Sequence, residues 1–322
     1  SKDNFKALKI LKKIIAEEEY DIIQCNTPMG GIITRLAAKK ARKKGTKVVY
    51  MAHGFHFYKG ASKKAWMVLY PIEKHFAKKC DTLITITDED YALASKKFKT
   101  NVVQMHGVGV SEERYHAVDI EKCLEMRASE GLGVEDFVLL CTGELNKNKN
   151  QVTLLCAANA LKDKIPNLKI LLAGNGPLQA DLEKQVQDYG LQNVVRFLGY
   201  RTDLEKVVPA VDMIVSCSRR EGLPLNIIEA LLCKKPIVAS VNRGHKELIK
   251  DGENGYLFAP EDWETMAKRI FEVYQGEEKT LSEMGEKGYQ IAQKYTVAAV
   301  EEELRRIYDL RSEAAWRFCR FA

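Results

Sequence analysis

The chain has 322 residues, 46% of them hydrophobic and 29% charged, which is the composition of a soluble globular protein of about two domains. It contains no apolar run of the roughly 18–20 residues that span a bilayer. Its eight cysteines include no C-x-x-C pair, which argues against a zinc site or a disulfide framework. Residues 1–120 carry 22 Lys and Arg against 13 Asp and Glu, within a net charge of +6. This basic first part indicates an anionic partner, lipid or nucleic acid, unless its charges belong to solvated helix faces.

The first part of the chain alternates amphipathic helices with short apolar strands, the pattern of a parallel α/β sheet. Helices are expected over residues 3–18, 32–42, 63–79 and 88–97, with Gly30-Gly31 opening the second of them. Strands are expected over 21–25, 47–51, 82–86 and 101–104. Because this series starts on a helix, we expect the N-terminal domain to lack its first strands.

Two polar loops follow strands of this first part. The loop after strand 47–51 begins at His53, and a His beside a Gly at a strand tip suits a polar contact or proton transfer. A lone His is more often structural, and His56 competes for any role. Asp88-Glu89-Asp90 could hold a metal. Acids in the first turn of a helix, capped by Thr87 or Asp88, explain the triplet more simply.

Residues 62–79 combine large apolar side chains with five lysines. This composition suits a helix at the surface of an anionic membrane. A helix packed into the core with basic ends explains it equally well, and Pro71 would kink either version.

The periodicity is lost between residues 107 and 120, and the pattern then restarts. Strands are expected over 137–142, 168–173, 194–198, 212–216, 236–240 and 255–258. Helices are expected over 119–130, 150–163, 177–189 and 224–232, and long helices over 261–313. This second part predicts a complete doubly wound domain, whose ligand should lie at the carboxyl ends of its strands.

Between residues 212 and 232 the sequence pattern changes from that of an apolar strand to that of a helix, with Gly222 and Pro224 at the turn between them. The free N–H groups of such a helix start form an anion site. Glu229 lies one to two turns inside the helix, where its carboxylate could accept hydrogen bonds from ligand hydroxyls. Alternatively, Glu221 favours the helix dipole and Glu229 lies on a wet face. Spacing alone supports both interpretations.

Two further loops suit a phosphorylated ligand. Gly174 and Gly176 follow strand 168–173 as part of a dinucleotide fingerprint, with Gln179 in place of its third Gly. Such a glycine turn lets a nucleotide approach the backbone. Lys147 and Lys149, in the loop after strand 137–142, suit phosphate neutralisation, although a solvated loop would also explain either one.

These pieces together resemble the retaining glycosyltransferases of family 4, which have the GT-B fold of two Rossmann-like domains facing a cleft. Residues 221–229 match the family's E-x7-E motif, and the match continues through 234–240 and 247–255. Residues 27–31 and 52–60 are similar to the branch that builds bacterial capsular polysaccharides and exopolysaccharides. The resemblance runs from about residue 3 to 310. Residues 311–322 fit no part of it.

The resemblance implies a metal-independent hexosyltransferase that binds a nucleotide sugar, UDP-linked rather than GDP-linked, in its second domain. It implies catalytic roles for His53, Glu221 and Lys149. It implies no nucleic acid and no metal site, and a lipid-linked saccharide as acceptor. The donor-binding residues that it implies are Lys147, Lys149, Gly174, Gly176, Arg201, Glu221, Gly222, Leu223, Pro224, Leu225, Asn226 and Glu229.

We therefore expect a shortened bacterial enzyme of the cytoplasm, with peripheral contact to the anionic inner face of the plasma membrane. Its acceptor domain is predicted over 1–117, its donor domain over 118–297, and a C-terminal helix that returns to the first domain, with an atypical tail, over 298–322. Two alternatives are an inactive nucleotide-sugar-binding module with a broken acceptor half, and a nucleotide-sugar epimerase on the same fold.

Overall fold

The computed structural model describes residues 2–308 of the chain. Contacts divide them into two compact units, one of residues 2–107 and 300–308 and one of Val108–Ala299. The domain boundary expected at 117/118 thus falls inside the second unit, where the N–H of Val110 donates to the Tyr295 carbonyl (2.9 Å). Residues 311–322, which fit no part of the family pattern, lie outside the described residues. None of the described helices combines the length and apolarity of a membrane span.

The first unit is a parallel sheet of four strands in the order β1-β2-β3-β4. Its strands are β1 (Ile22–Cys25), β2 (Lys47–Ala52), β3 (Thr82–Thr85) and β4 (Asn101–Gln104). Its helices are α1 (Lys2–Glu18), α2 (Pro28–Ala37), α3 (Lys39–Lys43), α4 (Lys63–Ala77) and α5 (Asp88–Lys97), joined by most of α14 (Val297–Ile307). Side chains alternate along β2, so Val48, Tyr50 and Ala52 enter one common core.

The second helix starts earlier than Gly30-Gly31 predicted. Thr27 caps α2 by accepting the Gly30 N–H (3.2 Å), and Pro28 occupies its first turn. Gly31 instead lies against the ring of Tyr50, where an added Cβ would stand 2.7 Å from a ring carbon. The glycine pair therefore brings α2 close to the sheet.

The second unit is a parallel sheet of six strands in the order β10-β9-β8-β5-β6-β7. The strands are β5 (Phe137–Thr142), β6 (Leu168–Ala173), β7 (Val195–Gly199), β8 (Met213–Ser216), β9 (Ile237–Ser240) and β10 (Tyr256–Phe258). The helices are α6 (Ile120–Ser129), α7 (Gln151–Leu161), α8 (Gln179–Asp188), α9 (Leu204–Ala210), α10 (Leu225–Leu232), α11 (Arg243–Leu248), α12 (Trp263–Tyr274) and α13 (Glu278–Ala292).

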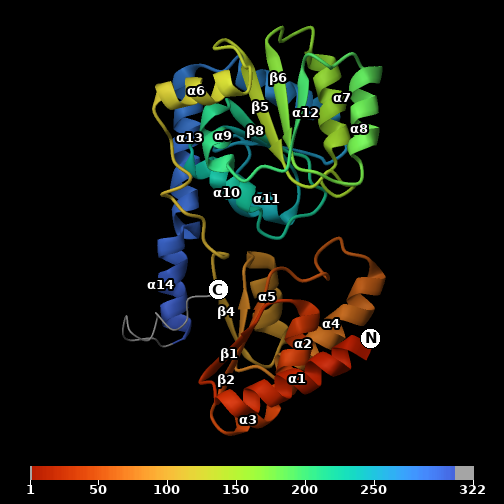
Figure 1. Ribbon diagram of the computed structural model, residues 1–322, viewed down its shortest axis with the longest axis vertical. Helices are drawn as coiled ribbons and strands as arrows, with labels where there is room; N and C mark the ends of the chain where they lie inside the picture. The colour runs from red at the N-terminus through yellow and green to blue at the C-terminus, as the bar shows by residue number, and fades with distance from the viewer. Residues whose placement is uncertain (1, 309–322) are drawn as a thin grey trace. The chain divides into compact units, whose positions relative to one another are not determined.

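Helices cover both faces of this second sheet and form two separate cores (Figure 1). α9, α10 and the end of α13 pack on one face, whereas α7, α8 and α12 pack on the other. The strand order reverses between β5 and β8, because β5 pairs with β6 on one side and with β8 on the other. Such a switch point opens a crevice at the carboxyl ends of the two central strands.

Gly174 and Gly176 leave no room for a side chain, which predicts a stability cost for substitution. An added Cβ on Gly174 would stand 2.1 Å from the Gly143 carbonyl oxygen, at a φ of +142° that L-residues avoid. We expect Gly174→Ala to lower the free energy of unfolding by about 3 kcal/mol or more. Gly252→Ala is the matched control, because Gly252 has a φ of +79° but nothing within 4 Å. It should cost only about 1 kcal/mol. Urea unfolding of both variants decides this, and equal losses would contradict the account.

Candidate functional site

The candidate site lies at the switch point of the second sheet. β5 runs into a loop over residues 143–150, and β8 runs into a loop over residues 217–224. Lys149 comes from the first loop and Glu221 from the second. The Nζ of Lys149 donates to Oε1 of Glu221 at 2.8 Å. The structure thus brings together two side chains that are 72 positions apart in sequence.

Glycine positions the lysine of this pair. The aliphatic stem of Lys149 passes over Gly143, where an added Cβ would stand 2.9 Å from Cε. Asn146 fixes the backbone of the same loop by accepting the Lys149 N–H on Oδ1 (2.9 Å). The amine therefore reaches the crevice across the backbone of its own loop. Lys147, in contrast, is exposed.

Three hydrogen bonds to main-chain carbonyls connect the two loops. The N–H of Arg219 donates to the Asn148 carbonyl (2.8 Å), and the side-chain amide of Asn148 donates to the Arg220 carbonyl (3.0 Å). The Arg219 guanidinium donates to the Lys147 carbonyl (2.6 Å). These bonds hold the backbone just before Lys149 in one loop and just before Glu221 in the other.

Gly222, Leu223 and Pro224 lead into α10, which begins at Leu225. Pro224 occupies the N-cap position, and no side chain caps the helix. The first N–H groups of any helix have no partner within it, so this start presents free donors and the positive end of the helix dipole. The side-chain nitrogen of Asn226 is also buried with no hydrogen-bond partner among the described residues. An anionic ligand suits these groups.

Three more buried polar atoms on these loops lack a hydrogen-bond partner within residues 2–308. They are Thr142 Oγ1, Gln151 Oε1 and Ser218 Oγ. Thr142 ends β5, Gln151 starts α7, and Ser218 follows β8. Buried polar groups are nearly always satisfied in folded proteins. Their clustering on the switch-point loops is what a polar ligand or bound water would explain.

Helix α11, which was not predicted from the sequence, packs against the turn that carries Glu221. Gly244, in α11, approaches the turn so closely that an added Cβ would stand 2.4 Å from the Gly222 oxygen and 2.9 Å from the Glu221 Cβ. The helix was missed because its six residues are too few to show periodicity. Asn242, its N-cap, and Gly244 were the available signals.

A buried polar network lies under this turn and centres on His245, which was also missed. Its Nδ1 lies 2.6 Å from the Ser240 carbonyl, and its Nε2 lies 3.0 Å from the Ser216 hydroxyl. The proton thus belongs on Nδ1, which donates to the carbonyl, and Nε2 accepts from Ser216. The Ser240 hydroxyl and the Asn242 amide both donate to the Ser218 carbonyl (2.7 and 2.8 Å). The network joins β8, β9 and α11.

Glu229 lies in α10 and faces Tyr115, from the segment before α6. Burial raises the pKa of Glu229 above its ordinary value, although the neighbouring Tyr115 hydroxyl lowers it, and burial together with Glu229 raises the pKa of Tyr115. Tyr115 was not predicted, because it falls in the stretch without periodicity.

Gly174 and Gly176 have a structural reason to be glycine. Both press against the loop that carries Lys149: Gly174 meets the Gly143 carbonyl, and an added Cβ on Gly176 would stand 2.5 Å from the Leu145 nitrogen. They bring the loop after β6 against the loop after β5. Their contact with a nucleotide stays a prediction.

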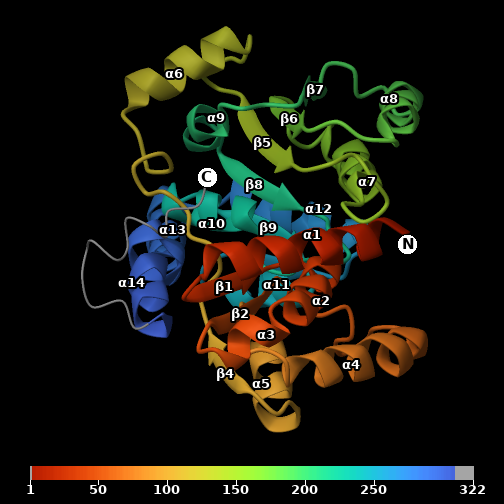
Figure 2. The ribbon, with the colours of Figure 1, turned by 60° about the horizontal axis from the view of Figure 1, so that its bottom comes forward.

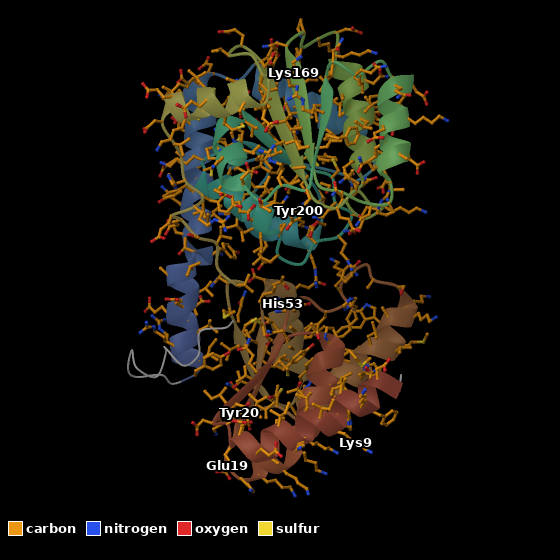
Figure 3. The ribbon with its side chains drawn as sticks, in the orientation of Figure 1. Lys9, Glu19, Tyr20, His53, Lys169 and Tyr200 are labelled. Carbon is orange, nitrogen blue, oxygen red and sulfur yellow. The ribbon has the colours of Figure 1, made fainter. Side chains whose placement is uncertain are left out.

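The guanidinium of Arg201 is already paired. It donates to both carboxylate oxygens of Asp203 (2.7 and 2.9 Å) and to Glu130 (2.6 Å). The bonds to Asp203 and Glu130 raise its pKa. Its side chain therefore serves the fold, and the backbone of residues 199–201 is what remains to contact a base. Lys169 is the second residue of β6. Figure 3 shows Tyr200, next to Arg201, at the opposite end of the unit from Lys169.

His53 belongs to the first unit, where it follows β2 directly (Figure 3). Partial burial lowers the pKa of its imidazole, which favours the neutral form. Its loop is held by the first turn of α5: the Asp90 carboxylate accepts the Phe55 N–H (2.9 Å), and Glu89 accepts the Lys59 N–H (2.5 Å). This gives the acidic triplet a structural role, with Thr87 capping α5 through the Asp90 N–H.

Comparison with known proteins identifies the class. The family described as "Glycosyl transferases group 1" matches residues 124–291, and "Glycosyltransferase Family 4" matches residues 2–105. The chain is 40% identical over 307 residues to "Putative glycosyltransferase EpsD" of Bacillus subtilis, covering 95% of this chain and 80% of that one. The chain therefore belongs to the family 4 glycosyltransferases.

Two further proteins are informative. The "UDP-Gal:alpha-D-GlcNAc-diphosphoundecaprenol alpha-1,3-galactosyltransferase" of Escherichia coli is 30% identical over 84% of this chain and 70% of its own. The crystal structure of Anabaena HepE in complex with UDP and glucose superimposes with a TM-score of 0.80 at 22% identity, over 94% of this chain and 81% of that one. The predicted α/β class and GT-B fold, with two parallel Rossmann-like sheets, are confirmed.

The buried imidazole predicts a pH dependence of stability. Burial lowers the pKa of His245 from 6.5 to about 4. Between these values the unfolded chain binds more protons than the folded one, so the free energy of unfolding falls as the pH falls. Over this window we expect wild type to lose about 2–3 kcal/mol more than His245→Gln does. Urea unfolding at several pH values measures this difference, and parallel curves for the two proteins would contradict it.

Proposed function

We propose that this glycosyltransferase moves a hexose from a UDP-sugar to a lipid-linked saccharide, with retention and without a metal, in the synthesis of a bacterial surface polysaccharide. The observation that carries the proposal is the Lys149–Glu221 pair beside the uncapped start of α10. It supplies a cation, a carboxylate and free N–H groups at the switch point of a nucleotide-binding fold.

Charge on the leaving diphosphate decides the rate in this kind of reaction, because the bond to the sugar breaks as negative charge develops on phosphate oxygen. In the proposal Lys149 and the backbone N–H groups of Gly222, Leu223, Leu225 and Asn226 receive that charge, and the exposed Lys147 adds a second cation. Lys149 already has an anionic partner in Glu221, so it is held in place before the donor arrives. These groups take over the role that a divalent cation has elsewhere.

The two glutamates take different parts of the donor. Glu221 orients hydroxyls of the transferred sugar, since it lies next to the lysine that binds the diphosphate. Glu229 accepts hydrogen bonds from the ribose hydroxyls, beside the neighbouring Tyr115 hydroxyl. Gly174, Gly176 and the backbone near Arg201 border the nucleoside. His53, whose lowered pKa favours the neutral form, serves the acceptor side as a hydrogen-bonding group near the transferred sugar.

The names of the relatives support the choice of substrates. The E. coli enzyme uses UDP-Gal and a GlcNAc-diphosphoundecaprenol acceptor. A Campylobacter jejuni relative, 27% identical over 93% of this chain, also carries a PP-undecaprenol acceptor in its name. An acceptor that stays in the membrane requires an enzyme at its surface. The excess of lysine in residues 1–120 suits the anionic inner face of a bacterial plasma membrane.

Binding of UDP tests the donor site. We expect Lys149→Met and Glu229→Ala each to weaken UDP binding by about 10-fold to 100-fold, the worth of a charged hydrogen bond. Lys169→Met is the control, because Lys169 lies at the other edge of the same sheet and donates to the Asn193 carbonyl. Calorimetry on the three variants decides. Unchanged binding in Lys149→Met and Glu229→Ala would sink the proposed site.

Chelation tests the role proposed for the cations. Transfer from the UDP-sugar should continue at an unchanged rate in excess EDTA, because Lys149 and the α10 N–H groups take the charge. In Lys149→Met, kcat should fall by about 100-fold or more with the product anomer unchanged. Product formation and its anomeric configuration are followed by NMR. Loss of activity in EDTA, restored by Mg²⁺ or Mn²⁺, would contradict the proposal.

A further inference from the structure

Helix α4 of the first unit is apolar on two faces. On its inner face, Trp66 and Tyr70 pack in an aromatic cluster around Phe57, with ring centroids 5.6 and 5.5 Å from it. On the opposite side lie exposed apolar side chains, which we call the outer face: Met67 (71% exposed), Val68 (48%), Leu69 (38%) and Ile72 (38%). The composition of residues 62–79 is compatible with a core helix and with an interfacial helix, and the structure combines features of both.

The outer face continues into a pocket of about 300 Å³ within the first unit. The start of α2, the loop after β2 and α4 form its walls, and α4 lies beside α2 and α5 in both views (Figures 1 and 2). Its lining is mostly hydrocarbon, contributed by Met29, Ile32, Phe55, Phe57, Leu69 and Ile72. Met29 is 54% exposed at the pocket wall.

Two polar side chains that line this pocket, Tyr50 and Glu73, already have hydrogen-bond partners within the first unit. The Glu73 carboxylate accepts hydrogen bonds from the Tyr50 hydroxyl (3.1 Å) and from an Arg35 nitrogen (3.4 Å). Its charge is therefore paired within the protein. His53 and His56 remain at the exposed loop. A sugar buried here would find few hydrogen-bond partners, which burial of its hydroxyls requires. A hydrocarbon chain needs none.

Lysines stand at both ends of the same helix. They are Lys63, Lys64, Lys74, Lys78 and Lys79. Among the described residues, the structure pairs none of them with a carboxylate. Lys74 and Lys79 lie near the rings of Tyr70 and Phe76 (5.6 and 4.5 Å), which keeps their stems along the helix. An apolar surface with cations at its ends is complementary to an anionic amphiphile.

We propose that the pocket and the outer face of α4 hold the hydrocarbon chain of a lipid diphosphate, the carrier of the acceptor saccharide. The chain lies against Met29, Leu69 and Ile72, and the lysines at one end of the helix receive the diphosphate. This inference rests on the proposed function, because it assigns the acceptor's lipid to a place in the first unit. It also explains why the outer face is apolar although the packing of the unit leaves it exposed.

A prenyl diphosphate that dissolves in water provides the test. Calorimetry in saturating UDP compares farnesyl diphosphate with inorganic diphosphate, so that the donor site is occupied in both titrations. Wild type should bind farnesyl diphosphate at least about 10-fold more tightly. Leu69→Asp/Ile72→Asp should reduce the difference to less than about 2-fold. Ile10→Asp, on α1 and 50% exposed, is the matched control and should keep the wild-type difference.

Equal affinity of wild type for the two probes overturns the proposal, as does an unchanged preference in the double variant. A benzophenone-bearing farnesyl diphosphate checks the position on wild type without any substitution. Its label should map to residues 28–32, 53–57 or 67–73, and a label confined elsewhere overturns the assignment. Should Leu69→Asp/Ile72→Asp not fold, this mapping decides alone.

Two controls accompany the prenyl titrations. UDP binding is measured on the same samples: if wild type binds no UDP, the proposed function fails, while the prenyl comparison in its absence still decides the pocket. Light scattering gives the oligomeric state. A wild-type dimer that Ile72→Asp converts to monomer, with prenyl binding intact, identifies the outer face as a subunit interface and overturns the proposal.

Discussion

The rest of the candidate site depends on how closely the backbone segments approach one another at the carboxyl edge of the second sheet. Gly174 and Gly176 bring the loop after β6 against the loop after β5, and Gly244 brings α11 against the turn at Glu221. At these places a single Cβ would collide with main-chain atoms. Lys149 and Glu221 meet at 2.8 Å because the backbones that carry them have no freedom to separate. The spacing of these loops is thus set by glycines, and two of them, Gly174 and Gly176, also border the nucleoside in the proposed site.

The electrostatics of the site follow from this backbone. A cation, a carboxylate and an uncapped helix start are held together before any ligand is present, and hydrogen bonds beneath them join β8, β9 and α11 through His245. Groups that are already in place stabilise developing charge without reorganising, which is the main source of electrostatic catalysis. Asn226 Nδ2 and Ser218 Oγ have no hydrogen-bond partner within residues 2–308, so they are available to a polar ligand.

Much of this was predictable from sequence, and what was not has physical causes. Apolar and periodic segments such as β5 and α7 were predicted correctly from the sequence pattern. The E-x7-E spacing of Glu221 and Glu229 indicated the family, which the comparisons confirmed. Periodicity cannot reveal a six-residue helix such as α11. It also cannot show that Arg201 is paired with Glu130, because the two residues are 71 positions apart and meet only in the folded chain. For α4, composition identified the two possibilities, and only the fold shows which apolar residues are exposed.

A crystal structure of this protein with UDP bound would decide whether the switch-point loops hold the diphosphate. The account predicts the diphosphate within hydrogen-bond distance, about 3 Å, of Lys149 Nζ and of the N–H groups at the start of α10. It also predicts the ribose hydroxyls on Glu229, and no cation bridging the phosphates. A nucleotide bound away from the switch point, or a diphosphate held by a metal ion with Lys149 still paired only to Glu221, would contradict it.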